Sequence, residues 1–591
     1  MKLIVAEKPS VARILAKAVD CGKKQKGYYE GKEYLVSWCI GHLVESAMPH
    51  EYGEKWKKWS LDKLPIFPEK WKYHVRESGK VQFFILSKLM KRKDIEKIVC
   101  ATDAGREGEL IFRHVYRESG CRKTVKRLWI SSLEEKTVKR GLQELQPSEK
   151  YDNLYRAALA REKADWIVGI NASRLFSLLY RQPFRVGRVM TPTLNLVCQR
   201  ETEREQFQPV PFYCAEISFG VLTAKSERFY EKEEAENCLD SCYDAKAGTV
   251  TSVKISEKTE KPPVLYDLTA LQRDANKKFG FSPQKTMECA QSLYENRRIT
   301  YPRTDSGYLT SDMEESTKEL VESLLKEYGK EGQLKDVQVK RLLNDGKVKD
   351  HHGILPTKES ISFPDRKELK QKSEEEKIFS LILLRLLEAV SSECLWEEKE
   401  ILIHCGNSEF SCRKKKMIYP GWRVFSGKEV QDEDESCEEA DDIFEGQILA
   451  LTEGILKEDK TSPPPSFTEG GLLHEMEKAG KSEDFGLGTP ATRSGILEKL
   501  IQSGYLNREG KGKTKILKPT EKAIQLITVL PEEIKSPSLT AEWEEKLKLI
   551  EDGTYSAEDF LTEIQNMICR MTESYQKALN SSGSFASDSA P

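Results

Sequence analysis

The sequence predicts a multidomain protein that combines an α/β domain at the N-terminus with separate helical and β-rich parts. Its 591 residues exceed what one hydrophobic core usually serves, so several domains are expected. Strand and helix signals alternate over residues 1–145, which is typical of a parallel sheet covered by helices. Strand-like alternation at residues 211–260 and 400–453 flanks a helical block. We therefore expect a helical domain inserted into a β domain on two connections.

The N-terminal elements follow from apolar runs and helix signals. Lys2–Glu7 (KLIVAE) is a short apolar strand, and Pro9 suits the first turn of the helix that follows it. The run Lys97–Asp103 (KIVCATD) is a second buried strand. The predicted order is strand, helix, strand, helix, strand, helix, at residues 2–7, 9–19, 97–103, 106–118, 124–131 and 135–145.

The remaining chain divides by composition. Residues 150–205 are helical, with a Gly/Pro break at PFRVGRVMTPT, and residues 265–390 are again largely helical. The last 130 residues are helical except for a basic hairpin, NREGKGKTKILKPT. The acidic run Glu429–Glu445, with ten carboxylates, is predicted to be a solvated loop. The Ser/Ala-rich tail from Ser581 is expected to be disordered.

Charge is distributed unevenly along the chain. The net charge is −2, yet residues 1–200 contain 40 Lys and Arg against 23 Asp and Glu. A basic N-terminal third suits a phosphate-binding surface. A solvated lysine-rich face explains the same composition equally well, so charge alone does not decide between the two.

Several locations and site classes are disfavoured by the sequence. No apolar run approaches the ~18 residues that span a bilayer, and the N-terminus lacks the long apolar stretch of a secretory signal. The protein is therefore expected in the cytoplasm, without a membrane partner. Fourteen cysteines are scattered without a CxxC repeat, so neither zinc nor disulfides are expected.

Carboxylates stand at the ends of two predicted strands. Glu7 ends the first strand, and Asp103 and Glu107 lie between a later strand and its helix. In open α/β sheets ligands gather at the carboxyl ends of strands, where these side chains would suit a hard cation such as Mg²⁺. Acidic residues at helix N-termini are also common as caps that pair with the helix dipole. The pattern leaves both interpretations open.

Tyr301 lies between two arginines, Arg298 and Arg303, and His351 follows some 50 residues later. A phenol with an ordinary pKa near ~10 becomes a usable nucleophile when cations stabilise the phenolate and the charge that develops on a phosphoryl group. Taken alone, Tyr-Pro-Arg is more often a turn with a packed ring. The nearest Walker A candidate, Gly512–Thr514, lies in the basic hairpin and lacks its first glycine, so nucleotide hydrolysis is not expected.

Seven motifs in this order resemble the type IA DNA topoisomerases, and within them the bacterial topoisomerase III branch. They run from residue 2 to about residue 550: KLIVAEKPSVA, ATDAGREGELIF, ALAREKADWIVGINASRLFS, RVGRVMTPTLNLV, RITYPRTDSGYL, DHHGILPT and GLGTPATRSGILEKLIQSGYL. The first resembles the start of that family's Toprim domain, and the second resembles its acidic motif.

The resemblance implies a toroid of four domains. They are a Toprim α/β domain at residues 1–150, a helical single-strand-binding domain at 151–212 and 461–580, a β-rich arch at 213–265 and 395–460, and a helical domain with the nucleophilic tyrosine at 266–394. A disordered tail is expected at 581–591. The active site would then form where the tyrosine-bearing domain meets the Toprim domain, and opening that interface would create a gate.

The resemblance also implies an ATP-independent topoisomerase that uses Mg²⁺. Tyr301 would attack a phosphodiester in single-stranded DNA and form a 5′-phosphotyrosine, so that the bond energy is stored covalently. A second strand would pass through the break, and religation would relax negatively supercoiled DNA and decatenate DNA. Arg303 would stabilise the transition state, and Lys8 would offer a proton or a charge to the scissile phosphate. Glu7 would act as acid, base or metal ligand, and His351 would meet the scissile region.

Other residues of the resemblance would hold the DNA strand. Arg161 and Asp165 are four apart, hence on one helical face, and their family counterparts hold the strand upstream of the cut. Arg188 matches an arginine that contacts DNA. The neighbours expected to line the same contact are Val186, Gly187, Val189, Met190 and Thr191. A helicase or a single-strand-binding protein is an expected partner, and a bacterial, nucleoid-associated location is implied.

Three features depart from the family pattern. The acidic motif commonly reads Asp-x-Asp-x-Glu, and Gly105 stands at its middle position, which removes one carboxylate. This weakens the case for two metal ions and favours Glu7 and Asp103 as ligands, with Glu107 as a further candidate. Met190 replaces a usual glutamine, and the four-cysteine zinc modules of many relatives are missing.

Two alternatives remain at this level. A Toprim primase or nuclease would work at Glu7 and Asp103 and would leave Tyr301 structural. A single-strand-binding scaffold would need only the lysines and aromatic residues.

Overall fold

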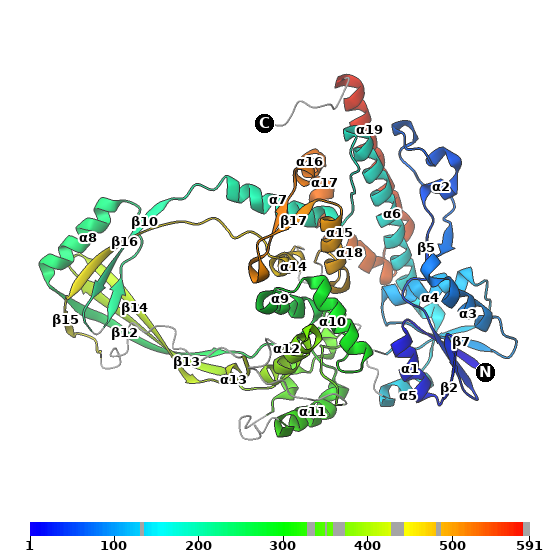
Figure 1. Ribbon diagram of the computed structural model, residues 1–591, viewed down its shortest axis with the longest axis horizontal. Helices are drawn as coiled ribbons and strands as arrows, with labels where there is room; N and C mark the ends of the chain where they lie inside the picture. Colours follow the sequence, from blue (N-terminus) through cyan, green and yellow to red (C-terminus); the bar gives the residue numbers. More distant parts are fainter. Residues whose placement is uncertain are drawn as a thin grey trace.

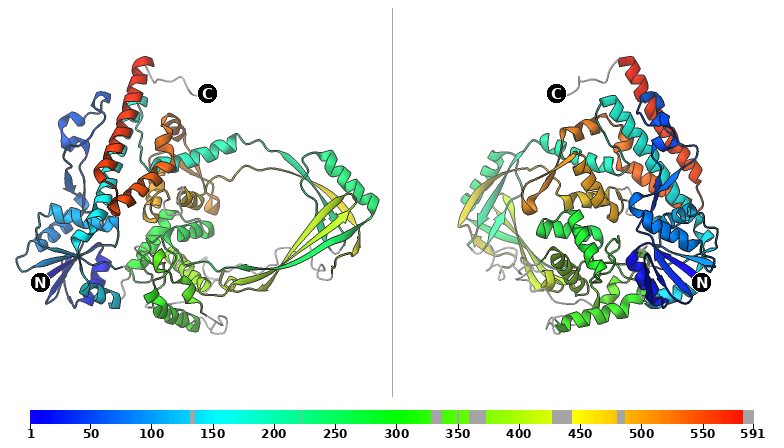
Figure 2. Two further views of the ribbon diagram at one scale, coloured as in Figure 1. Left: turned by 180° about the vertical axis from the view of Figure 1, so that it is seen from behind. Right: turned by 45° about the vertical axis from the view of Figure 1, so that its right-hand side comes forward.

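The computed structural model describes residues 1–130, 135–220, 222–327, 337–348, 351–358, 373–426, 443–479 and 486–582. These residues follow a ring in space (Figure 1), with the N-terminal α/β domain and two long helices on one side and a β-rich lobe on the other. A helical block carrying Tyr301 completes the ring next to the α/β domain (Figure 2). Most of the predicted acidic loop and nearly all of the predicted tail lie outside the described residues.

The N-terminal domain is built on a seven-stranded sheet of order β2-β3-β4-β1-β7-β8-β9. The four central strands run parallel: β1 (Lys2–Ala6) pairs with β4 (Tyr34–Trp38) and β7 (Lys97–Ala101), and β7 pairs with β8 (Val125–Arg127). The outer strands β2 (Lys23–Gln25), β3 (Tyr28–Glu30) and β9 (Gln146–Pro147) are antiparallel. The parallel sheet predicted from the apolar runs is confirmed.

Helices cover both faces of this sheet because alternate residues of each strand point to opposite sides. Leu3 and Val5 pack with α3 (Lys80–Met90) and α4 (Arg106–Glu118). Ile4 and Ala6 pack with α1 (Pro9–Ala18) and α5 (Glu135–Gln143). All four strand residues are fully buried, which explains the near-continuous apolar run of β1. Because β1 and β7 are neighbours, the residues after their carboxyl ends lie side by side.

The long helices form a second core from distant parts of the chain. It joins α6 (Asp152–Tyr180) and α7 (Met190–Glu205) to α14 (Glu469–Lys478), α15 (Pro490–Gln502), α16 (Glu521–Val529), α17 (Glu532–Lys535), α18 (Pro537–Glu551) and α19 (Ala557–Ser582). The buried alanines of α6 let α18 and α19 pack closely against it. The predicted basic hairpin is present as β17 (Leu506–Glu509) and β18 (Ile516–Pro519).

The β-rich lobe is a seven-stranded sheet of order β15-β12-β13-β14-β11-β10-β16. Its strands are β10 (Pro211–Ser218), β11 (Thr223–Lys225), β12 (Ala247–Glu260), β13 (Cys394–Cys405), β14 (Ser408–Tyr419), β15 (Ile448–Ala450) and β16 (Glu453–Lys460). The strand prediction for residues 211–260 is wrong over α8 (Lys232–Ala245), a helix whose buried face includes Ala235, Cys238 and Cys242. Those side chains pack on the sheet, so tertiary burial stabilises a short helix among strands.

The helical block contains α9 (Leu268–Phe279), α10 (Pro283–Glu295), α11 (Glu314–Glu327) and α12 (Glu374–Ala389) around one core. The chain enters it from β12 and leaves it into β13, and these two strands pair from Gly248–Cys405 to Glu260–Cys394. The block is therefore connected to the β-rich lobe by a pair of hydrogen-bonded strands, and Tyr301 lies in the loop that follows α10.

Within the described part of the chain, none of the helices is both long enough and apolar enough to cross a membrane.

Gly280 ends α9 with a left-handed backbone (φ +71°), and a Cβ there would meet the Gly512 carbonyl oxygen of the hairpin at 2.7 Å. We expect Gly280→Ala to lower the free energy of unfolding by at least about 1–2 kcal/mol, measured by chemical denaturation. Gly512→Ala is the matched control, because Gly512 has φ +58° but open space around it. Equal stability of the two variants would contradict the close packing of α9 on the hairpin.

Candidate active site

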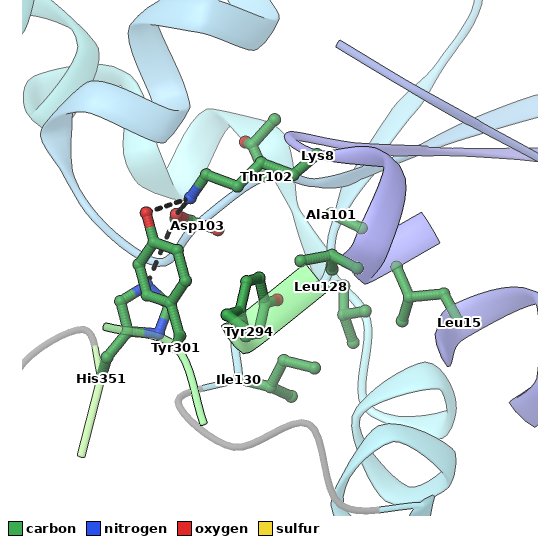
Figure 3. Close-up of a pocket in the computed structure, with 11 residues that line it drawn as sticks. Lys8, Leu15, Ala101, Thr102, Asp103, Leu128, Ile130, Tyr294, Tyr301 and His351 are labelled. Atoms are coloured by element: carbon green, nitrogen blue, oxygen red, sulfur yellow. Dashed lines mark hydrogen bonds and ion pairs between the residues drawn. The ribbon is translucent and has the colours of Figure 1, made fainter. Parts of the chain in front are cut away.

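Side chains from four separate parts of the chain meet at the carboxyl ends of β1 and β7 (Figure 3). The Lys8 ammonium donates hydrogen bonds of 2.6 Å to Asp103 Oδ2 and of 2.6 Å to Tyr301 Oη. Glu7 Oε1 lies 3.1 Å from Lys8 Nζ, and His351 Nε2 lies 3.4 Å from Asp103 Oδ2. Five residues proposed from the sequence therefore share one site, although 293 positions separate Lys8 from Tyr301.

The Tyr301 ring is held by two other rings. The His351 ring centroid is 4.4 Å away, and the Tyr294 ring meets Tyr301 edge to face with centroids 5.4 Å apart. Lys8 Nζ also lies 4.0 Å from the Tyr301 ring centroid. The phenol oxygen points at the ammonium (Figure 3), which is the orientation that a nucleophile activated by a cation needs.

Burial and charge set the protonation states of the site. Burial raises the pKa of Tyr301 to about 12, although Lys8 works to lower it. Burial opposes the charged forms of Lys8 and Asp103, yet their attraction keeps the pKa of the ammonium raised and that of the carboxyl well below its usual range. Burial, followed by repulsion from Asp103, raises the pKa of Glu7. The site therefore contains a cation, an anion, a neutral phenol and a carboxyl, Glu7, whose pKa lies above that of an ordinary glutamate.

The two arginines beside Tyr301 behave differently. Arg303 is exposed, and its charge helps to lower the pKa of the Tyr301 phenol. Arg298 instead forms an ion pair with Glu376, and its guanidinium lies 4.1 Å from the Phe379 ring centroid. Arg303 is thus the arginine free to meet a ligand near the phenol.

Comparison with known proteins agrees with this geometry. A family model described as DNA topoisomerase matches residues 149–562, and one described as Toprim domain matches residues 2–133. The chain belongs to the type IA DNA topoisomerases. It is therefore a DNA-binding isomerase of a family that cleaves a DNA strand and passes another through the break, and the fold class predicted from the sequence is confirmed.

Relatives of this topoisomerase cover almost the whole chain. It is 37% identical to "DNA topoisomerase 3" of Bacillus subtilis (strain 168), over 99% of this chain and 83% of the relative. It is 38% identical to "DNA topoisomerase 3" of Staphylococcus saprophyticus, over 95% of this chain and 80% of the relative. The solved structure of full-length topoisomerase I from Thermotoga maritima matches with a TM-score of 0.72 at 25% identity, covering 95% of this chain and 89% of that one.

The carboxylates of the Toprim domain offer a site for one metal ion. Glu7 and Asp103 are adjacent, since the Asp103 backbone N–H donates to Glu7 Oε2 over 3.2 Å. The third predicted ligand, Glu107, is hydrogen-bonded to His42 instead. Across the described ranges, no three His, Cys, Asp or Glu side chains are grouped as a metal site. The donor set fits a single Mg²⁺ that keeps most of its water, which one or two carboxylates commonly hold.

Arg127 fixes the loop that carries Asp103, and the sequence analysis did not identify it. Its side chain is fully buried and donates to the backbone oxygens of Cys100, Thr102, Asp103 and Leu128. An ion pair of 3.1 Å with buried Glu109 balances its charge. Gly108 lies directly under the Asp103 carbonyl, where a Cβ would clash. An arginine at the end of a short strand, directly before the apolar run Leu128–Ile130, was the signal that could have revealed this role.

The predicted strand-binding residues lie around one carboxylate, Glu544 of α18. Arg188 is 4% exposed, and its guanidinium is paired with Asp165 at 2.8 Å and with Glu544 at 3.4 Å. Arg106, beside the loop that carries Asp103, forms an ion pair with Glu544 at 2.9 Å. Arg161 is held more loosely, at 3.8 Å from Glu544 and 3.9 Å from Asp165. Arg161 is therefore the cation of this group best able to reach a DNA phosphate.

The residues around Arg188 form the loop that starts α7. Val186 and Thr191 are buried, whereas Gly187, Val189 and Met190 are half-buried. The Gly187 N–H donates to Thr191 Oγ1 over 3.1 Å, so this loop is held by its own hydrogen bonds. The buried members shape the loop and are not open to direct contact with DNA.

Arg127→Lys should destabilise the protein by about 3 kcal/mol or more, because one ammonium cannot donate to four carbonyls and also keep the contact with buried Glu109, which would then depend on Arg113. Denaturation monitored by circular dichroism measures this loss. Arg122→Lys, at an exposed position nearby, is the control and should change little. If Arg127→Lys unfolds at the same denaturant concentration as the parent, Arg127 does not hold the loop that carries Asp103 in the way proposed.

Proposed function

We propose that the enzyme cleaves single-stranded DNA without ATP through a 5′-phosphotyrosine at Tyr301. A second strand passes through the break and the first is religated, which relaxes negative supercoils and decatenates DNA. The observation that supports this most directly is the 2.6 Å hydrogen bond between Lys8 Nζ and Tyr301 Oη. It places a cation on the oxygen of the one phenol that the family resemblance assigns as nucleophile.

In the cleavage step, Tyr301 Oη would bond to phosphorus while the bond from phosphorus to the 3′-oxygen breaks. The phenol must lose its proton, and Lys8 would stabilise the developing phenolate. The 3′-oxygen must gain a proton, and Glu7 is suited to pass it on because its raised pKa lets it take up a proton more readily than an ordinary glutamate. Religation would run the same path backwards, with the Glu7 carboxylate taking the proton back.

Positive side chains would hold the DNA backbone on either side of the reacting bond. Exposed Arg303 would pair with the non-bridging oxygens of the phosphate, where a planar guanidinium can make two bonds. Arg161 would bind an upstream phosphate, with Asp165 and Arg188 shaping the surface beside it. His351 would contact the scissile region from its place between Tyr301 and Asp103.

Glu7 and Asp103 would hold Mg²⁺, which would supply positive charge next to the DNA backbone when bound. Glu107 could join them only by leaving His42. The hydrogen bond of Lys8 to Asp103 and its ion pair with Glu7 provide part of the same charge compensation without a metal.

The absence of a nucleotide requirement is supported by the hairpin. Gly512–Thr514 forms a short 3₁₀ turn between β17 and β18, whereas a P-loop lies between a strand and a helix. A Toprim nuclease or primase is disfavoured because the topoisomerase model matches residues 149–562. DNA with single-stranded regions is the proposed substrate, and a helicase or single-strand-binding protein that exposes such regions, in the bacterial nucleoid, is the proposed context.

Tyr301→Phe should abolish both relaxation of supercoiled plasmid and covalent attachment to DNA, because no other nucleophile replaces the phenol oxygen. The assay incubates plasmid with Mg²⁺ and no ATP, and then denatures the protein rapidly. Tyr308→Phe, in the same loop, is the matched control and should keep both activities. Relaxation by Tyr301→Phe at the parent rate would refute the proposed function.

Lys8→Met should slow cleavage of a single-stranded oligonucleotide by about 100-fold at pH 7. Without the ammonium the pKa of Tyr301 rises further above its value of about 12, so a smaller fraction of phenolate is present at every pH. The rate should still increase with pH, and the profile should lie at higher pH than that of the parent. Lys17→Met, on the exposed side of α1, is the control. Coincident pH profiles for Lys8→Met and the parent would rule out this role for Lys8.

A further inference from the structure

Tyr294, the penultimate residue of α10, places a second phenol in the active-site pocket. It belongs to the helical block that carries Tyr301, and only 8% of it is exposed. In Figure 3 its ring stands next to Tyr301 on one side and faces Leu128 and Ile130 on the other. No step of the proposed chemistry uses this residue.

The pocket around Tyr294 is made by the Toprim domain. Its apolar lining comes from α1, from β7 and from the segment that follows β8, through Val11, Leu15, Ala101, Leu128 and Ile130. Tyr294 lines this pocket from the other body, where it is also part of the core of its own helical block, and an aromatic ring at such a boundary is a usual form of interface anchor. Tyr294 therefore joins the two bodies that must separate when a strand passes.

The same ring also contacts the nucleophile. Tyr294 and Tyr301 meet at an interplanar angle of 71°, which is a favourable edge-to-face arrangement. The His351 ring contacts Tyr301 as well. Together these two rings restrict the Tyr301 ring to the orientation in which its oxygen reaches Lys8.

The Tyr294 hydroxyl is poorly accommodated. Its oxygen is buried and lies outside hydrogen-bond distance of the described residues. Burial raises the pKa of this phenol, and the nearby Ser10 side chain offsets that rise only in part. Burying a hydroxyl without a partner opposes closure of the interface. A phenylalanine would keep the ring contacts and remove this opposition.

We propose that Tyr294 is a positioning residue that anchors the Tyr301-bearing block in the Toprim pocket and orients Tyr301, while its unpartnered hydroxyl keeps the closed interface weak enough to reopen. This inference rests on the proposed function and adds to it a determinant of gate opening. It predicts that removal of the ring weakens the closed interface and slows cleavage. Removal of the hydroxyl alone should strengthen the closed interface.

The first experiment isolates positioning by measuring cleavage of a short single-stranded oligonucleotide, which requires no strand passage. Tyr294→Ala should lower the single-turnover cleavage rate by about 30-fold and leave the Kd for the oligonucleotide within about twofold. Tyr294→Phe should restore the parent rate, and Tyr294→Leu should fall between them. If Tyr294→Ala cleaves at the parent rate, or if Tyr294→Phe is as slow as Tyr294→Ala, the positioning role is overturned.

The second experiment measures gate opening with two fluorophores, one on the Toprim domain and one on the Tyr301-bearing block, in the covalent DNA complex. Tyr294→Phe should lower the ratio of open to closed molecules by about tenfold, equivalent to about 1.4 kcal/mol. Tyr308→Phe should leave the ratio unchanged. An unchanged or increased open fraction in Tyr294→Phe would overturn the role given to the hydroxyl.

The two failures are distinguishable. A parent protein that forms no covalent complex through Tyr301 would refute the proposed function itself. A parent that forms the complex while all Tyr294 variants match it would refute only the inference about Tyr294.

Discussion

The half-buried ammonium of Lys8 provides the interaction on which the site depends. It comes from the end of β1, and it bonds at once to Asp103 of the same domain and to Tyr301 of another. Removing a cation from water is costly unless charges and acceptors surround it. Asp103, Glu7 and the Tyr301 oxygen provide that surrounding, and the Tyr301 oxygen is present only when the helical block is docked. Closure of the ring and assembly of the chemistry are therefore the same event.

The rest of the fold keeps these partners in place. The parallel pairing of β1 with β7 puts Lys8 and Asp103 side by side, and Arg127 holds the Asp103 loop from beneath by four backbone oxygens. On the other side of the Asp103 loop, Arg106 forms an ion pair with Glu544 of α18. Glu544 also pairs with Arg188. The residues proposed to bind the DNA strand and the loop that carries Asp103 therefore share one buried carboxylate.

Local patterns predicted the parts of the site that follow from strand order. Buried parallel strands leave near-continuous apolar runs, so the positions of Glu7, Lys8 and Asp103 could be inferred from the sequence. Tyr301 and His351 came from motifs in family order, and the structure brings both to Lys8 and Asp103. The division into four domains and the chemical roles of the site residues stay predictions.

Other features depend on contacts that no local pattern encodes. Glu107 bonds to His42, which lies shortly after β4, the strand next to β1. A histidine just after a strand of this sheet was the available signal. Arg188 is buried by Asp165 and by Glu544, which is 356 positions away, so sequence alone could not show that it is closed to solvent. Helix α8 was missed because the strands on both sides dominated the pattern.

The most direct test of the account is to identify the atom that joins protein to DNA. The covalent complex with a single-stranded oligonucleotide would be digested with protease and nuclease, and the modified peptide would be sequenced by mass spectrometry. The account predicts one modified residue, Tyr301, joined to a nucleotide through its 5′-phosphate. A nucleotide on any other residue, or a link through a 3′-phosphate, would contradict it.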